Sequence, residues 1–233
     1  MNTTDAIILA GGRGTRLQGI ISDIPKPLAP VNGKPFLDIL LSQLNHVQAI
    51  QHVVIAAGYK SEKIVERYQG SSAYRFSILF SEERELLGTG GAIKKALSLT
   101  TSEGVLILNG DSYVDADIEG LFRFQRENHA RISIVLTEMD NANRYGYATV
   151  DSRNRIQRFE EKQSQEKRGL INAGMYFLDR TLFDRVPENR VISFEKELLP
   201  KMIQDGAYGF IVAGKFIDIG VPESYHAAEQ YFT

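Results

Sequence analysis

The sequence predicts an α/β protein with a Rossmann-like, mixed, mostly parallel sheet flanked by helices and a small β-rich lobe. In the first half, short apolar runs alternate with amphipathic stretches, which is the pattern of β-α-β units. In the second half, the pattern changes to β-rich segments. A length of 233 residues with 43% hydrophobic side chains suits one domain over residues 1–233, with two halves that divide near residue 115.

The first half is expected to supply the parallel strands and the helices that cover them. Strands are predicted at the apolar runs Ala6–Ala10, His52–Ala57, Phe76–Phe80 and Val105–Asn109. One helix is predicted over Phe36–Val47, because its apolar residues fall on a single stripe, and a second over Gly90–Leu99.

The second half begins with a predicted helix at Asp117–Asn128, which Asp117 would cap. Strands are then expected at Ile132–Thr137, Tyr147–Asp151, Ile156–Glu160 and Leu170–Leu178, with a polar loop or hairpin tip at Glu160–Arg168. A helix at Ser193–Gln204 lacks a full capping box but has acidic residues in its first turn. A strand at Lys215–Ile219 and a helix from Pro222 complete the chain.

The charge balance excludes several classes of function. The chain has 27 basic and 29 acidic side chains, so its net charge of −2 gives no general attraction to nucleic acid or to an anionic membrane. Without cysteine there is no disulfide, thiolate metal site or cysteine nucleophile. The N-terminus predicts no signal peptide or membrane span. We expect a cytoplasmic protein that acts on small molecules, and a homo-oligomer is left open.

A glycine-rich loop, Gly11–Arg16, directly follows the first predicted strand. Such a loop can present backbone N–H groups to an anion at the carboxyl end of the strand, although a tight connection is the alternative. It is not a dinucleotide fingerprint, because Leu17 stands where a third glycine is needed. Nor is it a P-loop, since Ile20-Ile21 replaces the lysine and the hydroxyl residue.

Three cations near this loop favour phosphate binding. Arg13 and Arg16 offer guanidinium donors suited to phosphate oxygens, which a purely structural turn does not need. Lys26 stands between Pro25 and Pro27, which restrict the backbone there, although a solvated lysine is the other interpretation.

These residues resemble the signature of the sugar-1-phosphate nucleotidyltransferases, in the segments Leu9–Leu17, Pro25–Leu28 and Gly33–Phe36. The resemblance implies a nucleotide-binding half at about residues 1–115 and a sugar-binding half at about 116–233. It also implies that the triphosphate is bound by the glycine loop and two neighbouring cations, through Leu9, Ala10, Gly11, Gly12, Arg13, Gly14, Arg16 and Lys26.

The same resemblance implies Mg²⁺ held by two aspartates. Asp111 and Asp218 each stand beside a glycine at the end of a predicted strand, where a turn or helix-cap aspartate would be the more common role. Transfer between phosphates requires positive charge, usually Mg²⁺ on one or two carboxylates. Asn109-Gly110-Asp111 and the segment starting at Asp218 resemble the two metal positions of the family.

Base and sugar positions also follow from the resemblance. Gly88–Ala92 matches the segment that lies along the base, so Gly88, with Thr89 and Glu82, is expected to contact the nucleotide. A helix N-terminus is the alternative interpretation. The sugar phosphate is expected at three matching stretches, through Gly146, Glu161, Lys162 and Asn172.

The implied reaction joins a sugar 1-phosphate to an NTP without a protein nucleophile, with Arg16, Lys26, Asp111 and Mg²⁺ as the catalytic groups. The overall pattern is most similar to D-glycero-α-D-manno-heptose 1-phosphate guanylyltransferases, which implies GTP as donor and a GDP-heptose for capsule or lipopolysaccharide synthesis. Mannose-1-phosphate guanylyltransferases and N-acetylmuramate-1-phosphate uridylyltransferases share the motifs. A catalytically silent regulatory subunit is the alternative from another class, and Leu17 disfavours a dinucleotide-dependent oxidoreductase.

Overall fold

The structure of the protein is a computed structural model, which describes residues 3–17, 19–21, 23–140, 144–160 and 168–232. Its strands are β1 (Thr4–Ala10), β2 (Pro30–Val31), β3 (Lys34–Pro35), β4 (Ile50–Ala57), β5 (Ser77–Glu82), β6 (Gly104–Asn109), β7 (Ser112–Val114), β8 (Ile132–Met139), β9 (Tyr147–Val150), β10 (Ile156–Glu160), β11 (Gly169–Asp179), β12 (Ala207–Val212) and β13 (Phe216–Asp218). Its α-helices are α1 (Phe36–Asn45), α2 (Ser61–Tyr68), α3 (Gly88–Ala96), α4 (Ile118–Glu127), α5 (Leu199–Gln204) and α6 (Pro222–Tyr231).

The central sheet is mixed, and its main path runs β5-β4-β1-β6-β11-β8-β12. Along this path the neighbours are parallel, except that β11 runs antiparallel to both β6 and β8. The hairpin of β9 and β10 pairs with the beginning of β11 and completes the nine-stranded sheet. The predicted mixed, mostly parallel sheet is therefore confirmed.

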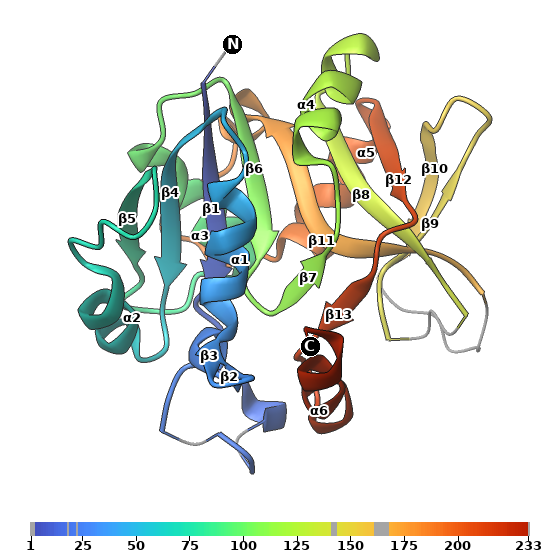
Figure 1. Ribbon diagram of the computed structural model, residues 1–233. Helices are drawn as coiled ribbons and strands as arrows, with labels where there is room; N and C mark the ends of the chain where they lie inside the picture. Colours follow the sequence, from blue (N-terminus) through green and yellow to red (C-terminus); the bar gives the residue numbers. More distant parts are fainter. Residues whose placement is uncertain (1–2, 18, 22, 141–143, 161–167, 233) are drawn as a thin grey trace.

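Helices cover both faces of the sheet, as the buried β1 shows. Ala6 and Ile8 belong to the core beneath α1, α2, α4 and α6, whereas Ile7 belongs to the core beneath α3 and α5. Successive strand side chains point to opposite faces, so a strand that is apolar throughout requires cover on both sides. Figure 1 shows α1 and α4 in front of the sheet, with α3 and α5 behind it.

The long strand β11 contains a bulge at which it changes partners. Before the bulge, Leu170–Ile171 pair with β9, and after it Met175–Asp179 pair with β6. The register with β8 shifts between Asn172 and Tyr176, and Gly174 between them has a φ of 75°. A positive φ favours glycine, and bulges redirect strands beside functional sites.

A separate two-stranded sheet joins segments that are far apart in the sequence. β7 and β13 pair antiparallel, with Asp218 opposite Ser112. The Ile219 N–H also donates a hydrogen bond of 2.8 Å to the carbonyl of Asp111. Asp111 and Asp218 are therefore brought to the ends of neighbouring strands.

Most predicted elements are present with small shifts in their bounds, but α2, β12 and the short strands β2, β3 and β7 were not predicted. The polar loop predicted at Glu160–Arg168 lies largely outside the described residues. The signal for α2 is short, because only Ile64 and Tyr68 are buried in a largely polar segment. In β12, Gly209 argues against a strand. The structure explains this glycine, since a Cβ there would lie 2.5 Å from the Leu136 side chain.

The predicted start of α4 is confirmed, whereas the helix predicted from Ser193 begins differently. Asp117 accepts a hydrogen bond of 2.8 Å from Gly120 N and caps α4 as predicted. The helix predicted from Ser193 is instead a π-helical turn, Phe194–Leu198, that continues into α5. Ser193 N donates to Glu197 Oε1 at 2.8 Å, so a reciprocal cap forms one position later than in the standard capping box.

None of the helices in the ranges described above is long and apolar enough to span a membrane.

At the end of the sheet where β1 begins, the Asp5 carboxylate links three segments. It is only 2% exposed, and its Oδ2 accepts hydrogen bonds from Thr101 N at 2.7 Å and Ser102 N at 3.0 Å. Its Oδ1 lies 2.9 Å from Nδ1 of His52 on β4. Burial alone would raise the pKa of Asp5, but these hydrogen bonds outweigh it and hold the pKa below its usual value.

We predict that Asp5→Asn lowers the free energy of unfolding by about 1–3 kcal/mol at neutral pH, because a buried acceptor of backbone N–H groups is weakened. The folded-state pKa is depressed, so this contribution is complete above the ordinary aspartate value of about 3.9. It declines as the pH falls from there towards the folded-state pKa. Urea unfolding at several pH values measures it.

The exposed Asp205 at the end of α5 provides a matched control. Asp205→Asn should change the free energy of unfolding by less than about 0.5 kcal/mol. Equal stability of Asp5→Asn and the wild type at neutral pH would contradict the linking role of Asp5.

Candidate active site

The glycine-rich loop lies at the carboxyl end of β1 and packs against Lys26. Gly14 has a φ of 59°, and its carbonyl accepts a hydrogen bond of 2.9 Å from Leu17 N. A Cβ on Gly14 would lie 3.0 Å from the Cβ of Lys26. Arg13 and Arg16 are exposed on this loop. The loop therefore supports Lys26 from one side and leaves two guanidinium groups in solvent.

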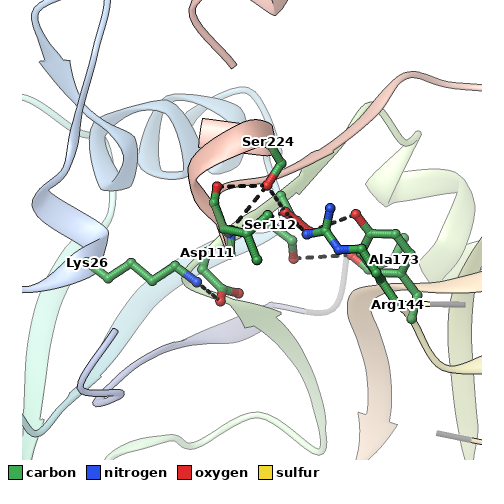
Figure 2. Close-up of polar contacts among 10 residues, drawn as sticks. Lys26, Asp111, Ser112, Arg144, Ala173 and Ser224 are labelled. Carbon is green, nitrogen blue, oxygen red and sulfur yellow. Dashed lines mark hydrogen bonds and ion pairs between the residues drawn. The ribbon is translucent and has the colours of Figure 1, made fainter. Parts of the chain in front are cut away.

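Lys26, in the short 3₁₀ helix Lys26–Leu28, forms an ion pair with Asp111, which lies two residues beyond the end of β6. Its Nζ lies 2.5 Å from Asp111 Oδ2 (Figure 2). The Lys26 side chain is 12% exposed, whereas Asp111 is 43% exposed. Lys26 opens a 3₁₀ turn between the buried Pro25 and Pro27, which restrict the backbone as expected.

Two cavities meet at this ion pair. The larger has a volume of about 290 Å³ and is lined by Leu9, Ala10, Gly11, Gly12, Lys26, Pro27, Glu83, Leu86, Gly88, Thr89, Ala92, Asn109, Gly110, Asp111 and Glu195. The smaller has a volume of about 180 Å³ and is lined by Arg16, Lys26, Asn109, Asp111, Ser112, Arg144, Tyr145, Asn172, Ala173, Gly174, Phe216, Asp218 and Gly220. Lys26, Asn109 and Asp111 belong to both walls.

The glycines that open α3 allow the chain around residue 192 to approach closely. A Cβ on Gly88 would lie 2.6 Å from the Ile192 carbonyl oxygen, and one on Gly91 would lie 2.4 Å from the carbonyl oxygen of Arg190. Gly90 N donates to the Ile192 carbonyl at 2.8 Å. Gly88 does line the larger cavity, but the glycine pattern is required by this packing of segments.

The Thr89 hydroxyl is occupied by contacts within the protein. It donates to Glu195 Oε2 at 2.7 Å and accepts from Phe194 N at 2.8 Å. These bonds fix the π-helical turn against α3 and hold the Glu195 carboxylate in the wall of the larger cavity. Thr89 thus positions Glu195, a residue that the sequence analysis did not select.

In the smaller cavity, the Asp218 carboxylate accepts hydrogen bonds from several groups and is 8% exposed. The donors are Tyr145 Oη at 2.7 Å, Ser224 Oγ at 2.5 Å, Gly220 N at 3.1 Å and Arg144 Nη2 at 3.0 Å from Oδ2. Figure 2 shows Arg144 and Ser224 on the same side of the site as Asp111.

These donors keep Asp218 ionised. Burial alone would raise its pKa, but the hydrogen bonds from Ser224, Tyr145 and Gly220 outweigh it and hold the pKa below the usual value. Burial and the neighbouring carboxylate raise the pKa of the Tyr145 hydroxyl, which therefore stays protonated and donates.

Asn172 lies in the wall of the smaller cavity but is also part of the bulge in β11. Its Nδ2 donates to the buried Tyr176 hydroxyl at 2.6 Å, and its Oδ1 accepts from Gly174 N at 3.0 Å. The Gly146 carbonyl accepts a hydrogen bond of 2.8 Å from Asn172 N. Gly146 therefore holds the backbone of a residue that lines the smaller cavity. A Cβ on Gly174 would lie 2.6 Å from Ser112 Oγ, which explains the glycine there.

The structure brings most, but not all, of the predicted residues to these walls. Arg13, Gly14, Glu82 and Gly146 line neither cavity. Glu82 is exposed and accepts a hydrogen bond of 2.9 Å from Ser61 Oγ, whereas the neighbouring Glu83 lines the larger cavity. Glu161 and Lys162 lie outside the described residues.

The sequence analysis missed three charged residues that line the cavities. Glu83 and Glu195 line the larger cavity, and Arg144 lines the smaller one. The sequence signal for two of them is their position beside a selected residue, since Glu83 follows Glu82 and Arg144 lies two residues before Gly146.

Asp111 and Asp218 provide carboxylates, the donor type that Mg²⁺ prefers, in the wall of the smaller cavity. Within the described parts of the chain, no cluster of three or more acidic, histidine or cysteine side chains could hold a metal alone. Mg²⁺ usually binds one or two carboxylates together with water and phosphate oxygens, so the donor chemistry of these two aspartates suits such an ion.

The family model described as "Nucleotidyl transferase" matches residues 5–233. The chain is 41% identical to the D-glycero-alpha-D-manno-heptose 1-phosphate guanylyltransferase of Aneurinibacillus thermoaerophilus, over 97% of both chains. It is 34% identical to the mannose-1-phosphate guanylyltransferase of Mycobacterium tuberculosis, over 95% of this chain and 62% of that protein. The crystal structure of HddC from Yersinia pseudotuberculosis complexed with GMP-PN has a TM-score of 0.85 and 33% identity, over 98% and 99% of the two chains.

We predict that Gly174→Ala lowers the free energy of unfolding by about 1–3 kcal/mol, because a side chain would be strained at this φ and would press on Ser112. Urea unfolding measures the loss. Gly19→Ala is the control, since nothing lies within 4 Å of the Cβ that it would add. If both variants unfold like the wild type, the bulge tolerates a side chain and our account of Gly174 is wrong.

Proposed function

The chain belongs to the nucleotidyl transferase family, and we propose that it joins a sugar 1-phosphate to GTP, forming a GDP-sugar and pyrophosphate. We further propose D-glycero-α-D-manno-heptose 1-phosphate as the sugar substrate, because two relatives named for this activity are 41% identical over nearly the whole chain. The product would supply heptose for a capsule or lipopolysaccharide.

The observation that carries this proposal is the meeting of two cavities at the Lys26–Asp111 ion pair. The glycine loop lines the larger cavity, which suits the nucleotide. The smaller cavity is lined mainly by residues of the second half of the chain, which supports a sugar-binding half beyond about residue 115. Two substrates bound in these cavities would bring their reacting phosphates together at Lys26.

In the proposed reaction, a phosphate oxygen of the sugar 1-phosphate attacks the α-phosphorus of GTP. The bond from this phosphorus to the bridging oxygen breaks, and pyrophosphate leaves with that oxygen. The attacking oxygen is already anionic, so no general base is required. The protein has to align the two phosphates and neutralise the developing charge.

Three cations that line the cavities support this proposal. Lys26 lies in the shared wall, and Arg16 and Arg144 line the smaller cavity. The low exposure of Lys26 strengthens its interaction with charge, because screening by water is reduced. We assign Lys26 to the α-phosphate and Arg16 to the phosphates of the incoming substrates.

We propose that Asp111 and Asp218 hold Mg²⁺ together with substrate oxygens. Bound there, the ion would supply positive charge between the phosphates. The low pKa of Asp218 keeps its carboxylate ionised, and the exposed Asp111 can accept a further partner beside Lys26.

Mannose 1-phosphate is the second candidate substrate, supported by the 34% identity to a mannose-1-phosphate guanylyltransferase. A catalytically silent regulatory subunit is less well supported, because Arg16, Lys26, Asp111 and Asp218 all line the cavities.

The decisive experiment incubates the protein with Mg²⁺, each of the common NTPs and a panel of sugar 1-phosphates while pyrophosphate is measured. We expect the greatest release with GTP and the manno-heptose 1-phosphate. Preference for mannose 1-phosphate would replace the proposed sugar, preference for UTP would replace the proposed nucleotide, and no release with any pair would favour a silent binding protein.

We predict that Arg16→Ala and Asp111→Ala each slow pyrophosphate release about a hundredfold, since one charge-stabilising contact is worth about 3 kcal/mol in such sites. Both residues are at least partly exposed, so circular dichroism should show an intact fold.

The control for these variants is Arg126→Ala, on the exposed side of α4. It should react at the wild-type rate. Wild-type rates in Arg16→Ala or Asp111→Ala would refute the corresponding assignment.

A further inference from the structure

Arg144 is paired with Asp218 in the smaller cavity, which both residues line. Its Nη2 donates hydrogen bonds to both oxygens of the carboxylate, 3.2 Å to Oδ1 and 3.0 Å to Oδ2. The guanidinium carbon also lies over the Tyr145 ring, 5.5 Å from its centre. Arg144 therefore brings a positive charge to the wall of the cavity that suits the sugar 1-phosphate.

The Asp218 carboxylate is fully supplied with donors. Ser224 Oγ and Gly220 N donate to Oδ1 at 2.5 Å and 3.1 Å, and Tyr145 Oη donates to Oδ2 at 2.7 Å. A carboxylate oxygen has about two acceptor positions, and with Arg144 included each oxygen of Asp218 has at least two donors. Mg²⁺ can therefore reach Asp218 only where one of these donors withdraws.

Arg144 is the donor best able to withdraw. Its side chain is 43% exposed. Gly220 donates from the backbone, Ser224 lies in the first turn of α6, and the Tyr145 ring packs edge-on against Phe216 at 5.2 Å. Of the four donors, Arg144 alone is charged, and a cation on the same carboxylate would repel Mg²⁺.

The Arg144 guanidinium has further donors for a phosphate. Nη2 makes both contacts with Asp218, and no other residue in the described parts of the chain accepts a hydrogen bond from this guanidinium. The planar fork of an arginine matches two oxygens of one phosphate group. Arg16 lines the same cavity, so a phosphate bound there would have a second guanidinium group nearby.

We propose that Arg144 binds the phosphate group of the sugar 1-phosphate and leaves Asp218 to do so, which opens the Asp218 carboxylate to Mg²⁺. The inference rests on the proposed function. In this structure Lys26 balances the charge of Asp111, and Arg144 balances that of Asp218. In the exchange, the guanidinium replaces a carboxylate by a phosphate and the carboxylate replaces a guanidinium by a metal ion, so neither charge is left unpaired.

The first test removes the guanidinium in Arg144→Gln. With saturating Mg²⁺, calorimetric titration with the manno-heptose 1-phosphate should show about 10- to 100-fold weaker binding than in the wild type, the worth of hydrogen bonds to a charged group. Without substrates, Mn²⁺ should bind about five- to tenfold more tightly, as measured by electron paramagnetic resonance of the free ion, because its competitor for Asp218 is gone. A merely structural arginine would not move the two affinities in opposite directions.

The second test removes the charge of the partner in Asp218→Asn. Without metal, this variant should bind the same sugar 1-phosphate about five- to tenfold more tightly than the wild type, because Arg144 no longer has a competing carboxylate. This variant also tests the inference if Arg144→Gln does not fold, which circular dichroism checks for both.

The matched control is Arg123→Gln, which removes an arginine of α4 that is paired with Asp117 at 3.1 Å and lines neither cavity. It should bind the sugar 1-phosphate and Mn²⁺ like the wild type. Unchanged binding of the sugar 1-phosphate in Arg144→Gln would overturn the inference, as would equal or weaker binding of Mn²⁺ there. Metal-free binding in Asp218→Asn that is no tighter than in the wild type would also overturn it.

This inference and the proposed function fail in different ways. A wild-type protein that neither binds a sugar 1-phosphate nor releases pyrophosphate with one refutes both. If the wild type uses a sugar 1-phosphate and Arg144→Gln binds it equally well, the inference alone is refuted. Should mannose 1-phosphate be the preferred sugar, the same titrations are made with it and the same outcomes decide.

Discussion

The ion pair between Lys26 and Asp111 is the interaction on which the geometry of the site depends. It joins the segment after β1 to the end of β6, and both cavities share its two side chains. The glycine loop packs on Lys26 through Gly14, and the ladder of β7 and β13 begins directly after Asp111. Removal of either partner would leave a partly buried charge unpaired, so both substrate positions would be affected together.

Around this pair, the site is assembled by close approaches of the backbone at glycines. Gly110 N donates to the Leu9 carbonyl at 2.9 Å, and a Cβ there would lie 2.5 Å from that oxygen. Gly174 similarly admits Ser112 and Asn109 beside the bulge of β11. These approaches draw the ends of β1 and β6 and the bulge of β11 together, which explains why glycines accompany the charged residues of the site.

The sequence predicted the features that lie in contiguous segments. It missed those that depend on a shift of one residue along a strand or on a contact between residues far apart in the sequence. The glycine loop, Lys26, Asp111 and Asp218 are local signals. The shift from Glu82 to Glu83 is different, because side chains alternate across a strand and one residue decides whether a carboxylate faces solvent or cavity. Arg144 reaches Asp218 only through the tertiary fold, a contact that no local pattern encodes.

Under the proposed function, the distribution of charge in the larger cavity would orient the bound nucleotide. Lys26 provides positive charge at the wall shared with the smaller cavity, whereas Glu83 and Glu195 provide carboxylates in the wall formed with α3. In the reverse orientation, the triphosphate would meet these carboxylates and the base would meet Lys26, so repulsion disfavours it. A chain with a net charge of −2 could bind a triphosphate in the proposed way, because cations are concentrated at the wall that the two cavities share and along the smaller cavity.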